Sequence, residues 1–229
     1  MEILKGVIFD VDGTLIDSVD HHARAWKDSF QRFGLDVPFE ALRREIGKGA
    51  DQLLPVFLSE EQRAGFGEQL QEYRAELFKQ AFLPRVTPFP RVRELFRKLV
   101  ANGKHIALAS SASSEEVLHY EKLARIEDLV AVETSADDVE RSKPFSDIFA
   151  VALSKLGISG EQVIIVGDTP YDAEAAAKIG LEVLGLRCGA FGEEELLHSG
   201  CVATYRDPEE LLLEYSVWTQ GQPRLIHTS

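Results

Sequence analysis

Short, uninterrupted apolar runs recur along the chain, and they constrain its fold more than any other feature. The most apolar is 163–166, and comparable runs occupy 7–9, 106–109, 129–132, 183–186 and 201–203. Strands that are covered by helices on both faces of a parallel sheet have this character. Helical patterns such as 90–102 and 114–123 lie between the runs and supply the crossovers that parallel strands need. The sequence therefore predicts an α/β fold with a doubly wound, Rossmann-like parallel sheet.

One long segment, between the first two apolar runs, breaks this alternation. Apolar residues recur there at helical spacing from Val19 to Phe33, with Ser18 as a candidate N-cap and Gly34 as a candidate stop. Further helical patterns cover 39–45, 52–58 and 60–80. We therefore predict a small, all-helical cap domain over residues 17–84, inserted after the first strand of a core that residues 1–16 and 85–229 form.

Charge and length limit the class of protein and its partners. The 229 residues carry a formal net charge of −13, whereas nucleic-acid surfaces need a basic footprint. No apolar run approaches the roughly 20 residues that span a bilayer, and the first residues do not resemble a secretory signal. We expect a cytoplasmic protein without a nucleic-acid or membrane partner. Cys188 and Cys201 lack metal-ligand spacing and are expected to be buried thiols.

A pair of acidic residues follows the first predicted strand, in the run FDVDGTL. Ligands of open α/β sheets bind outside the carboxyl ends of strands, so Asp10 and Asp12 would face the binding crevice. Two carboxylates this close repel each other and are unfavourable to hold together without a cation. A turn at Asp12-Gly13 is the structural alternative, but it does not explain an acid directly after a buried strand.

A second acidic pair follows the most apolar run, in GDTPYD. Asp168 lies at the end of the strand, and Asp172 one helical turn along a helix that Pro170 opens and Gly180 ends. Acidic residues at a helix N-terminus are common, which is the structural alternative for Asp172. Two acidic strand ends in one sheet indicate a site for a hard cation, and we expect Mg²⁺.

Hydroxyl groups and one lysine complement these acids. Ser110 ends the run 106–109, and Ser111 follows at the start of a predicted helix, where hydroxyls and free N–H groups can bind an anion. An N-cap would explain the later serines but not Ser110. Lys143 in RSKPF is either a solvated loop charge or the cation that an acidic, phosphate-holding site still needs.

Taken together, these motifs resemble those of the haloacid dehalogenase (HAD) superfamily, in its phosphatases with a helical cap of the C1 type. DVDGTL resembles the DxDxT signature, Ser110 the Ser/Thr motif, Lys143 the lysine motif, and residues 167–172 the acidic motif. The four motifs occur in the order of the family, and the resemblance extends from residue 7 to about residue 213.

The resemblance implies roles for these residues. Asp10 would be the nucleophile that forms an aspartyl-phosphate, and Asp12 the general acid and base. Ser110 and Lys143 would bind the oxygens of the transferring phosphoryl group. This is the chemistry of a phosphatase that hydrolyses a small phosphomonoester. Dehalogenases of the superfamily lack the second aspartate, because a halide leaving group needs no proton.

The same resemblance implies a magnesium cofactor. Mg²⁺ would be held by Asp10, by the backbone carbonyl of Asp12 and by Asp168, and it would shield the nucleophile from the charge of the phosphate. Asp172 would support the metal or its water ligands.

Within the superfamily, the chain is similar to both phosphoglycolate phosphatases and β-phosphoglucomutases. In those mutases a histidine at the position of His22 helps to couple cap closure to acid/base chemistry. The interpretation we favour for His22 is packing on an apolar helix face. His22 nevertheless stays a candidate substrate-binding residue. Lys48, between two glycines, is a second candidate. Ala50 stands where mutases place an arginine for a second phosphate, which favours a phosphatase.

A catalytically inactive interaction protein on the same scaffold is the remaining alternative, because fold alone does not establish activity. The sequence does not indicate the leaving group or the oligomeric state. The tail 216–229 shows no clear pattern, and we expect it to be partly disordered.

Overall fold

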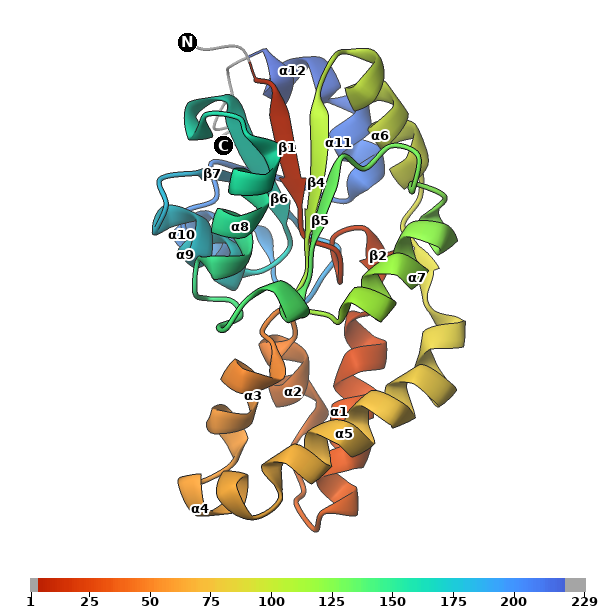
Figure 1. The fold of residues 1–229 in the computed structure, drawn as a ribbon, viewed down its shortest axis with the longest axis vertical. Coiled ribbons are helices and arrows are strands. Elements are labelled where there is room, and N and C mark those ends of the chain that lie inside the picture. Colours follow the sequence, from red (N-terminus) through yellow and green to blue (C-terminus); the bar gives the residue numbers. More distant parts are fainter. Residues whose placement is uncertain (1–3, 221–229) are drawn as a thin grey trace.

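The computed structural model describes residues 4–220, which are built around a six-stranded parallel sheet of order β5-β4-β1-β6-β7-β8 (Figure 1). Its strands are β1 (Gly6–Phe9), β4 (His105–Ala109), β5 (Val132–Thr134), β6 (Val163–Gly167), β7 (Glu182–Leu186) and β8 (Ala203–Tyr205). Every neighbouring pair is parallel. The α/β class and the doubly wound sheet predicted from the apolar runs are confirmed.

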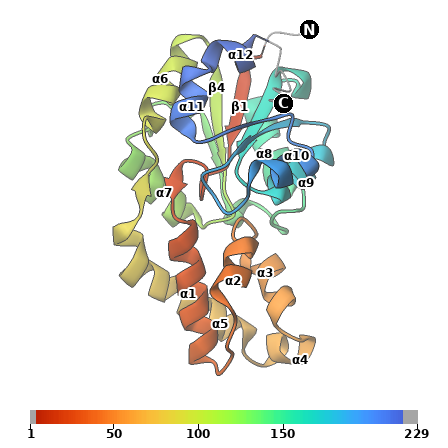
Figure 2. The same ribbon diagram turned by 180° about the vertical axis from the view of Figure 1, so that it is seen from behind.

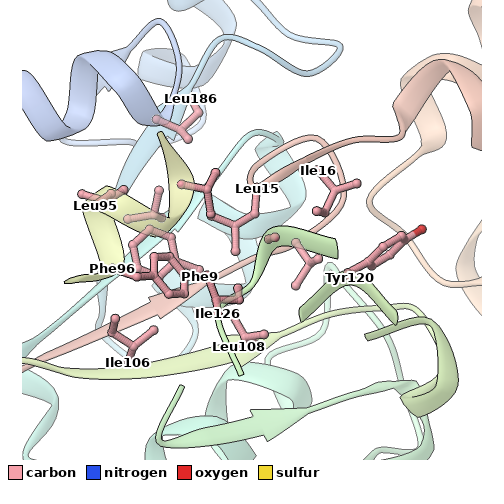
Figure 3. Packing of buried hydrophobic residues seen from close by; sticks show 14 of the residues in the cluster. Phe9, Leu15, Ile16, Leu95, Phe96, Ile106, Leu108, Tyr120, Ile126 and Leu186 are labelled. Atoms are coloured by element: carbon pink, nitrogen blue, oxygen red, sulfur yellow. The ribbon is translucent and has the colours of Figure 1, made fainter. Parts of the chain in front are cut away.

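Helices cover both faces of this sheet, as the two opposite views show (Figures 1 and 2). One apolar core lies under α6 (Val92–Ala101), α7 (Ser114–Ala124), α11 (Pro208–Leu213) and α12 (Tyr215–Thr219), and the other under α8 (Asp147–Leu156), α9 (Pro170–Ala177) and α10 (Glu193–His198). In the first core, the rings of Phe9 and Phe96 pack with their centroids 4.8 Å apart (Figure 3). Successive residues of β1 point into opposite cores, because side chains alternate along a strand.

The segment after β1 forms a helical cap beyond the carboxyl ends of the strands (Figure 1). Its helices are α1 (Val19–Arg32), α2 (Phe39–Glu45), α3 (Ala50–Phe57), α4 (Glu60–Gln62) and α5 (Glu68–Leu77), with π turns at Arg63–Gly67 and Phe78–Phe82 and a 3-10 turn at Leu83–Arg85. The cap has its own apolar core around Trp26, Phe30 and Leu53. A two-stranded antiparallel ribbon, β2 (Ile16–Asp17) with β3 (Thr87–Pro88), joins the two ends of the insertion, where no strand was predicted.

Several predicted boundaries were wrong. The run 129–132 is mostly a turn that follows α7, with the N–H of Leu129 bonded to the carbonyl of Ile126, and the strand begins only at Val132. Cys201 closes the end of α10 rather than opening a strand, and β8 begins at Ala203. Both thiols are free, but only Cys201 is buried, whereas Cys188 is half-buried. Short apolar runs are ambiguous in this way, because a capped helix end also buries them.

The tail and the start of α1 also differ from expectation. Residues 215–219 form α12, and Trp218 is buried with its indole N–H bonded to the carbonyl of Leu211. The rest of the predicted disordered tail, 221–229, lies outside the described residues. Ser18 occupies the N-cap position of α1, but its hydroxyl makes no cap and donates to Asp12 instead. Within residues 4–220, no helix combines the length and apolar character that crossing a membrane requires.

Glu121 allows a test of the packing between α7 and β5. Its side chain is buried; burial, followed by the nearby carboxylate of Glu133, raises the pKa of Glu121 to about 7 from an ordinary 4.5. The native state therefore keeps a proton that the unfolded chain releases, and the free energy of unfolding falls as the pH rises from 4.5 towards 7. We expect Glu121→Gln to raise the free energy of unfolding at pH 8 by about 1 kcal/mol after solvent screening, and by much less at pH 5.

Urea unfolding at the two pH values measures this difference. Glu161→Gln, at an exposed position on another part of the surface, serves as the control and should leave the pH dependence unchanged. An equal gain from Glu121→Gln at both pH values would contradict the proton-linked explanation.

Candidate active site

The carboxyl ends of three neighbouring strands form the floor of the site. β1 lies between β4 and β6, and Asp10, Ser110 and Asp168 come directly after these three strands. Asp172 lies in the first turn of α9, which begins at Pro170 as predicted. Carboxylate oxygens of Asp10, Asp168 and Asp172 lie within 4.8 Å of one another, and all three residues are buried. Two of the predicted motifs, far apart in the sequence, therefore meet at one point.

Lys143 is the cation of this cluster. Its side chain is fully buried, and Nζ forms ion pairs with Asp10 Oδ1 and, at 2.9 Å, with Asp172 Oδ1. The other oxygen of Asp172 accepts hydrogen bonds from the N–H and the hydroxyl of Thr169 at the start of α9. Asp172 thus both caps its helix and contacts the cluster. Its interpretation as an acid at a helix N-terminus and its interpretation as a member of the acidic site are therefore compatible. Lys143 is no solvated loop charge.

The cluster carries more negative than positive charge. Burial, followed by the like charges of Asp10 and Asp172, raises the pKa of Asp168 well above its ordinary value. Burial also raises the pKa of Asp10 to about 7, although the ammonium group of Lys143 opposes the shift. Three carboxylates facing a single lysine leave a deficit of two positive charges when all are ionised. Oxygen ligands with this deficit fit a hard divalent cation such as Mg²⁺.

Thr14 connects two of these carboxylates and was missed by the sequence analysis. Its hydroxyl oxygen lies 3.0 Å from both Asp10 Oδ2 and Asp168 Oδ1 and can donate to either. The signal was available, because Thr14 belongs to the same DVDGTL run and a buried hydroxyl beside two acids needs an acceptor.

Asp12 faces the cap rather than the carboxylate cluster. Its Oδ1 accepts hydrogen bonds from the hydroxyl of Ser18 at 2.6 Å and from His22 Nε2 at 2.8 Å. Burial on its own would raise the pKa of Asp12, but the contact with His22 and the hydrogen bonds from Ser18 and Tyr120 outweigh it and hold the pKa below its ordinary value. Asp10 and Asp12, two residues apart, are therefore in opposite electrostatic environments.

His22 has a polar role in addition to its packing. The ring stacks on Phe78 with centroids 3.9 Å apart, as an apolar-face position would predict. In addition, Nδ1 accepts a hydrogen bond from Arg74, because arginine can only donate. Nε2 therefore carries the ring hydrogen and donates the hydrogen bond to Asp12. The favoured interpretation of His22 as a packing residue alone was therefore wrong. Arg74 gave no sequence signal, since it lies within a continuous helical pattern.

The three remaining candidates lie around the site with different contacts. Ser110 is fully buried, and its Oγ accepts the N–H of Ala112 at 3.0 Å. The hydroxyl of Ser111 donates to the carbonyl of Gly47 in the cap at 3.1 Å. Lys48 pairs with Glu45 and lies 4.4 Å from the centre of the Tyr171 ring.

A cavity of about 380 Å³ lies between the cap and the core, and Asp10 and Asp12 form part of its wall. Its other lining residues include Trp26, Lys48, Ala50, Gln71 and Arg74 from the cap and Ser111, Glu116 and Asp137 from the core. The guanidinium of Arg74 lies over the ring of Trp26 at 5.1 Å, and it has no carboxylate partner among residues 4–220. The cavity can hold a small ester with its phosphate next to Asp10.

Comparison with known proteins agrees with this geometry. Residues 7–186 match the haloacid dehalogenase-like hydrolase family. A phosphoglycolate phosphatase from Yersinia pestis is 33% identical over 88% of this chain and 90% of its own length. A fructose-1-phosphate phosphatase from Escherichia coli is 25% identical over 81% of this chain and 98% of its own length. The crystal structure of a hydrolase from Pseudomonas syringae superposes with a TM-score of 0.85 and 26% identity, over 93% of this chain and 98% of that one. The chain therefore belongs to the haloacid dehalogenase-like hydrolases and is a phosphatase of their helical-cap group, acting on small phosphate esters.

Proposed function

We propose that the protein hydrolyses a small phosphomonoester with Mg²⁺ and through an aspartyl-phosphate on Asp10. The observation that carries the proposal is the position of Asp10: its carboxylate borders the cavity, contacts Lys143 and lies within 4.8 Å of oxygens of Asp168 and Asp172. A candidate nucleophile, a lysine and a carboxylate cluster that suits a divalent cation thus lie together beside the cavity, which supports the proposal.

In the first half of the reaction, a carboxylate oxygen of Asp10 attacks phosphorus and the bond from phosphorus to the leaving oxygen breaks. Asp12 gives its proton to that leaving oxygen, so the product departs as a neutral alcohol. The phosphate dianion beside Asp12 raises the pKa of this carboxyl, which lets it hold the proton until transfer. In the second half, Asp12 takes a proton from water, the oxygen of that water bonds to phosphorus, and the bond between phosphorus and Asp10 breaks.

Mg²⁺ would be held by carboxylate oxygens of Asp10 and Asp168 and by the backbone carbonyl of Asp12, with Asp172 as support. When bound, it offsets the charge of the carboxylates and of the phosphate, so that an anionic nucleophile can approach an anionic ester. Thr14, with its hydroxyl between Asp10 and Asp168, orients the two carboxylates.

Two groups would bind the transferring phosphoryl oxygens. Lys143 Nζ already contacts Asp10 and supplies positive charge beside the attacked phosphorus. Ser110 Oγ accepts the N–H of Ala112, and its own hydrogen has no acceptor among residues 4–220, so it can donate to a phosphoryl oxygen. Ala50 lines the cavity where a mutase would need an arginine for a second phosphate, which supports hydrolysis over phosphoryl transfer between sugar positions.

The first test is phosphate release from phosphoglycolate, hexose phosphates, nucleoside monophosphates and β-glucose 1-phosphate, each with Mg²⁺ and with a chelator. We expect release that depends on Mg²⁺, because the carboxylate cluster lacks two positive charges without it. Formation of glucose 6-phosphate without net release would identify a mutase, and inactivity on every ester would favour the interaction protein.

The acid and the nucleophile can be separated by isosteric substitutions. Asp10→Asn should lower kcat by more than about a thousandfold, because an amide oxygen cannot form the covalent intermediate. Asp12→Asn should lower kcat by about 10²- to 10⁴-fold, since it removes general acid/base catalysis. Steady-state kinetics measures both, with thermal unfolding to confirm the fold. Wild-type turnover by Asp10→Asn would rule out the covalent mechanism.

The metal site depends on a close approach by Gly189. A Cβ at this position would overlap the Oδ2 atom of Asp168, so Gly189→Ala has to displace that carboxylate. We expect the Mg²⁺ concentration for half-maximal activity to rise by about tenfold or more. Gly192→Ala in the same loop is the matched control, because its Cβ would have no heavy-atom neighbour closer than 3.9 Å. Equal metal dependence of the two variants would argue against Asp168 as a ligand.

A further inference from the structure

The loop between α2 and α3 inserts into the core at the carboxyl ends of the strands. Gly47 packs so closely against Thr169 that a Cβ added to Gly47 would lie 2.7 Å from the methyl carbon of Thr169. The carbonyl of Gly47 also accepts a hydrogen bond from the hydroxyl of Ser111. Gly49 approaches Ser142 even more closely, and its N–H donates to Ser142 Oγ at 3.0 Å. One cap loop therefore contacts the core segments that carry Ser110, Lys143 and Asp168.

A further contact, next to this loop, joins Asp51 to Ser142. Asp51 lies in the first turn of α3, and its two carboxylate oxygens accept hydrogen bonds from the hydroxyl of Ser142 and, at 3.1 Å, from the backbone N–H of Ser142. Ser142 is only 6% exposed. Ser142 Oγ also accepts the N–H of Gly49, the N-cap residue of α3, so a core serine satisfies a free donor at the start of a cap helix.

Ser142 is covalently joined to Lys143, which makes this contact relevant to the chemistry. The segment 139–146 that carries both residues has no helix or strand of its own. On one side, Lys143 is held by Asp10 and Asp172 of the core; on the other, the backbone of Ser142 is held by Asp51 of the cap. A carboxylate that binds both the N–H and the hydroxyl of one residue restricts the rotation of that peptide.

We infer that Asp51 is a positioning residue that fixes Lys143 through Ser142 when the cap covers the cavity. The inference rests on the proposed function, since it assigns Asp51 an effect on the step in which Lys143 contacts the phosphoryl group. Asp51 and Ser142 both line the cavity between cap and core, and their contact forms only while the cap lies against the core. The placement of Lys143 thereby depends on cap closure.

A purely structural role for Asp51 would give different results. Asp51 also places a negative charge in the first turn of α3, where it favours the helix. If Asp51 only stabilised α3, removing its carboxylate would lower the thermal stability of the protein. The hydrogen exchange of the Ser142 amide and the value of kcat would then stay unchanged. The experiment therefore measures protection, kinetics and stability separately.

Hydrogen exchange followed by mass spectrometry tests the contact without turnover. In Asp51→Ala, the peptide that contains Ser142 should exchange at least about tenfold faster than in the wild type, because the N–H of Ser142 loses its acceptor. Glu40→Ala, which removes an exposed acid from the first turn of the neighbouring cap helix α2, is the matched control and should exchange like the wild type. Unchanged exchange in Asp51→Ala would overturn the inference.

Kinetics on the best ester of the panel tests the effect on Lys143. We expect Asp51→Ala to lower kcat by about tenfold with KM within about twofold, and Ser142→Ala to lower kcat by about threefold. The double variant should be no slower than Asp51→Ala, because both substitutions break one pathway; independent effects would multiply to about thirtyfold. Asp51→Asn keeps an acceptor for the N–H and should fall between Asp51→Ala and the wild type.

Several outcomes would count against the inference. Wild-type kcat in Asp51→Ala, multiplicative effects in the double variant, or a loss of activity that follows a loss of thermal stability would each overturn it. An inactive wild type would instead refute the proposed function, and the exchange measurement would still decide whether the Asp51–Ser142 contact exists in solution.

Discussion

The electrostatic balance of one buried cluster is the constraint on which the rest of the structure depends. Asp10, Asp168 and Asp172 bring three carboxylates together, and among residues 4–220 Lys143 neutralises part of their charge. Burying such charges is unfavourable unless they are paired and hydrogen-bonded. The parallel sheet supplies rigid positions for Asp10 and Asp168, the first turn of α9 supplies Asp172, and both apolar cores hold these elements in register. The stability of the strands therefore maintains an unfavourable but reactive arrangement of charge.

The helical cap takes part in the same arrangement rather than only covering it. His22 of α1 bonds to Asp12, the loop at Gly47 bonds to Ser111, and Asp51 of α3 bonds to Ser142. The first contact reaches a proposed catalytic residue, Asp12. The other two reach Ser111 and Ser142, the sequence neighbours of Ser110 and Lys143. A movement of the cap on binding or release of the ester would thereby change the order of the groups proposed to react.

The sheet and its charged strand ends could be predicted from sequence because their signals are local. A buried parallel strand is a continuous apolar run, and an acid directly after it faces the ligand side, as Asp10 and Asp168 do. The position of β5 and the contacts of the cap could not be predicted in this way. Ser142 and Asp51 are 91 positions apart, and neither the spacing nor the composition around Asp51 distinguishes it from an ordinary acid at a helix start. Such pairings depend on how two domains pack, which periodicity does not encode.

The two aspartates of the DVDGTL run show why position within a motif decides function. Asp10 points towards the carboxylates of the core, where burial, followed by the like charges of Asp172 and Asp12, raises its pKa, whereas Lys143 favours its ionised form. Asp12 points towards hydrogen-bond donors, among them Ser18 and His22, which lower its pKa. Without metal and ester, these shifts run against the proposed roles, so the division between nucleophile and proton carrier would depend on a cation that favours the ionised form of Asp10 and on a phosphate that raises the pKa of Asp12. Residues two positions apart would share one face of a continuous strand, but the chain leaves β1 after Phe9 and turns at Val11, where its carbonyl accepts the N–H of Leu15. In the proposed mechanism, this turn decides which carboxylate attacks and which one moves the proton.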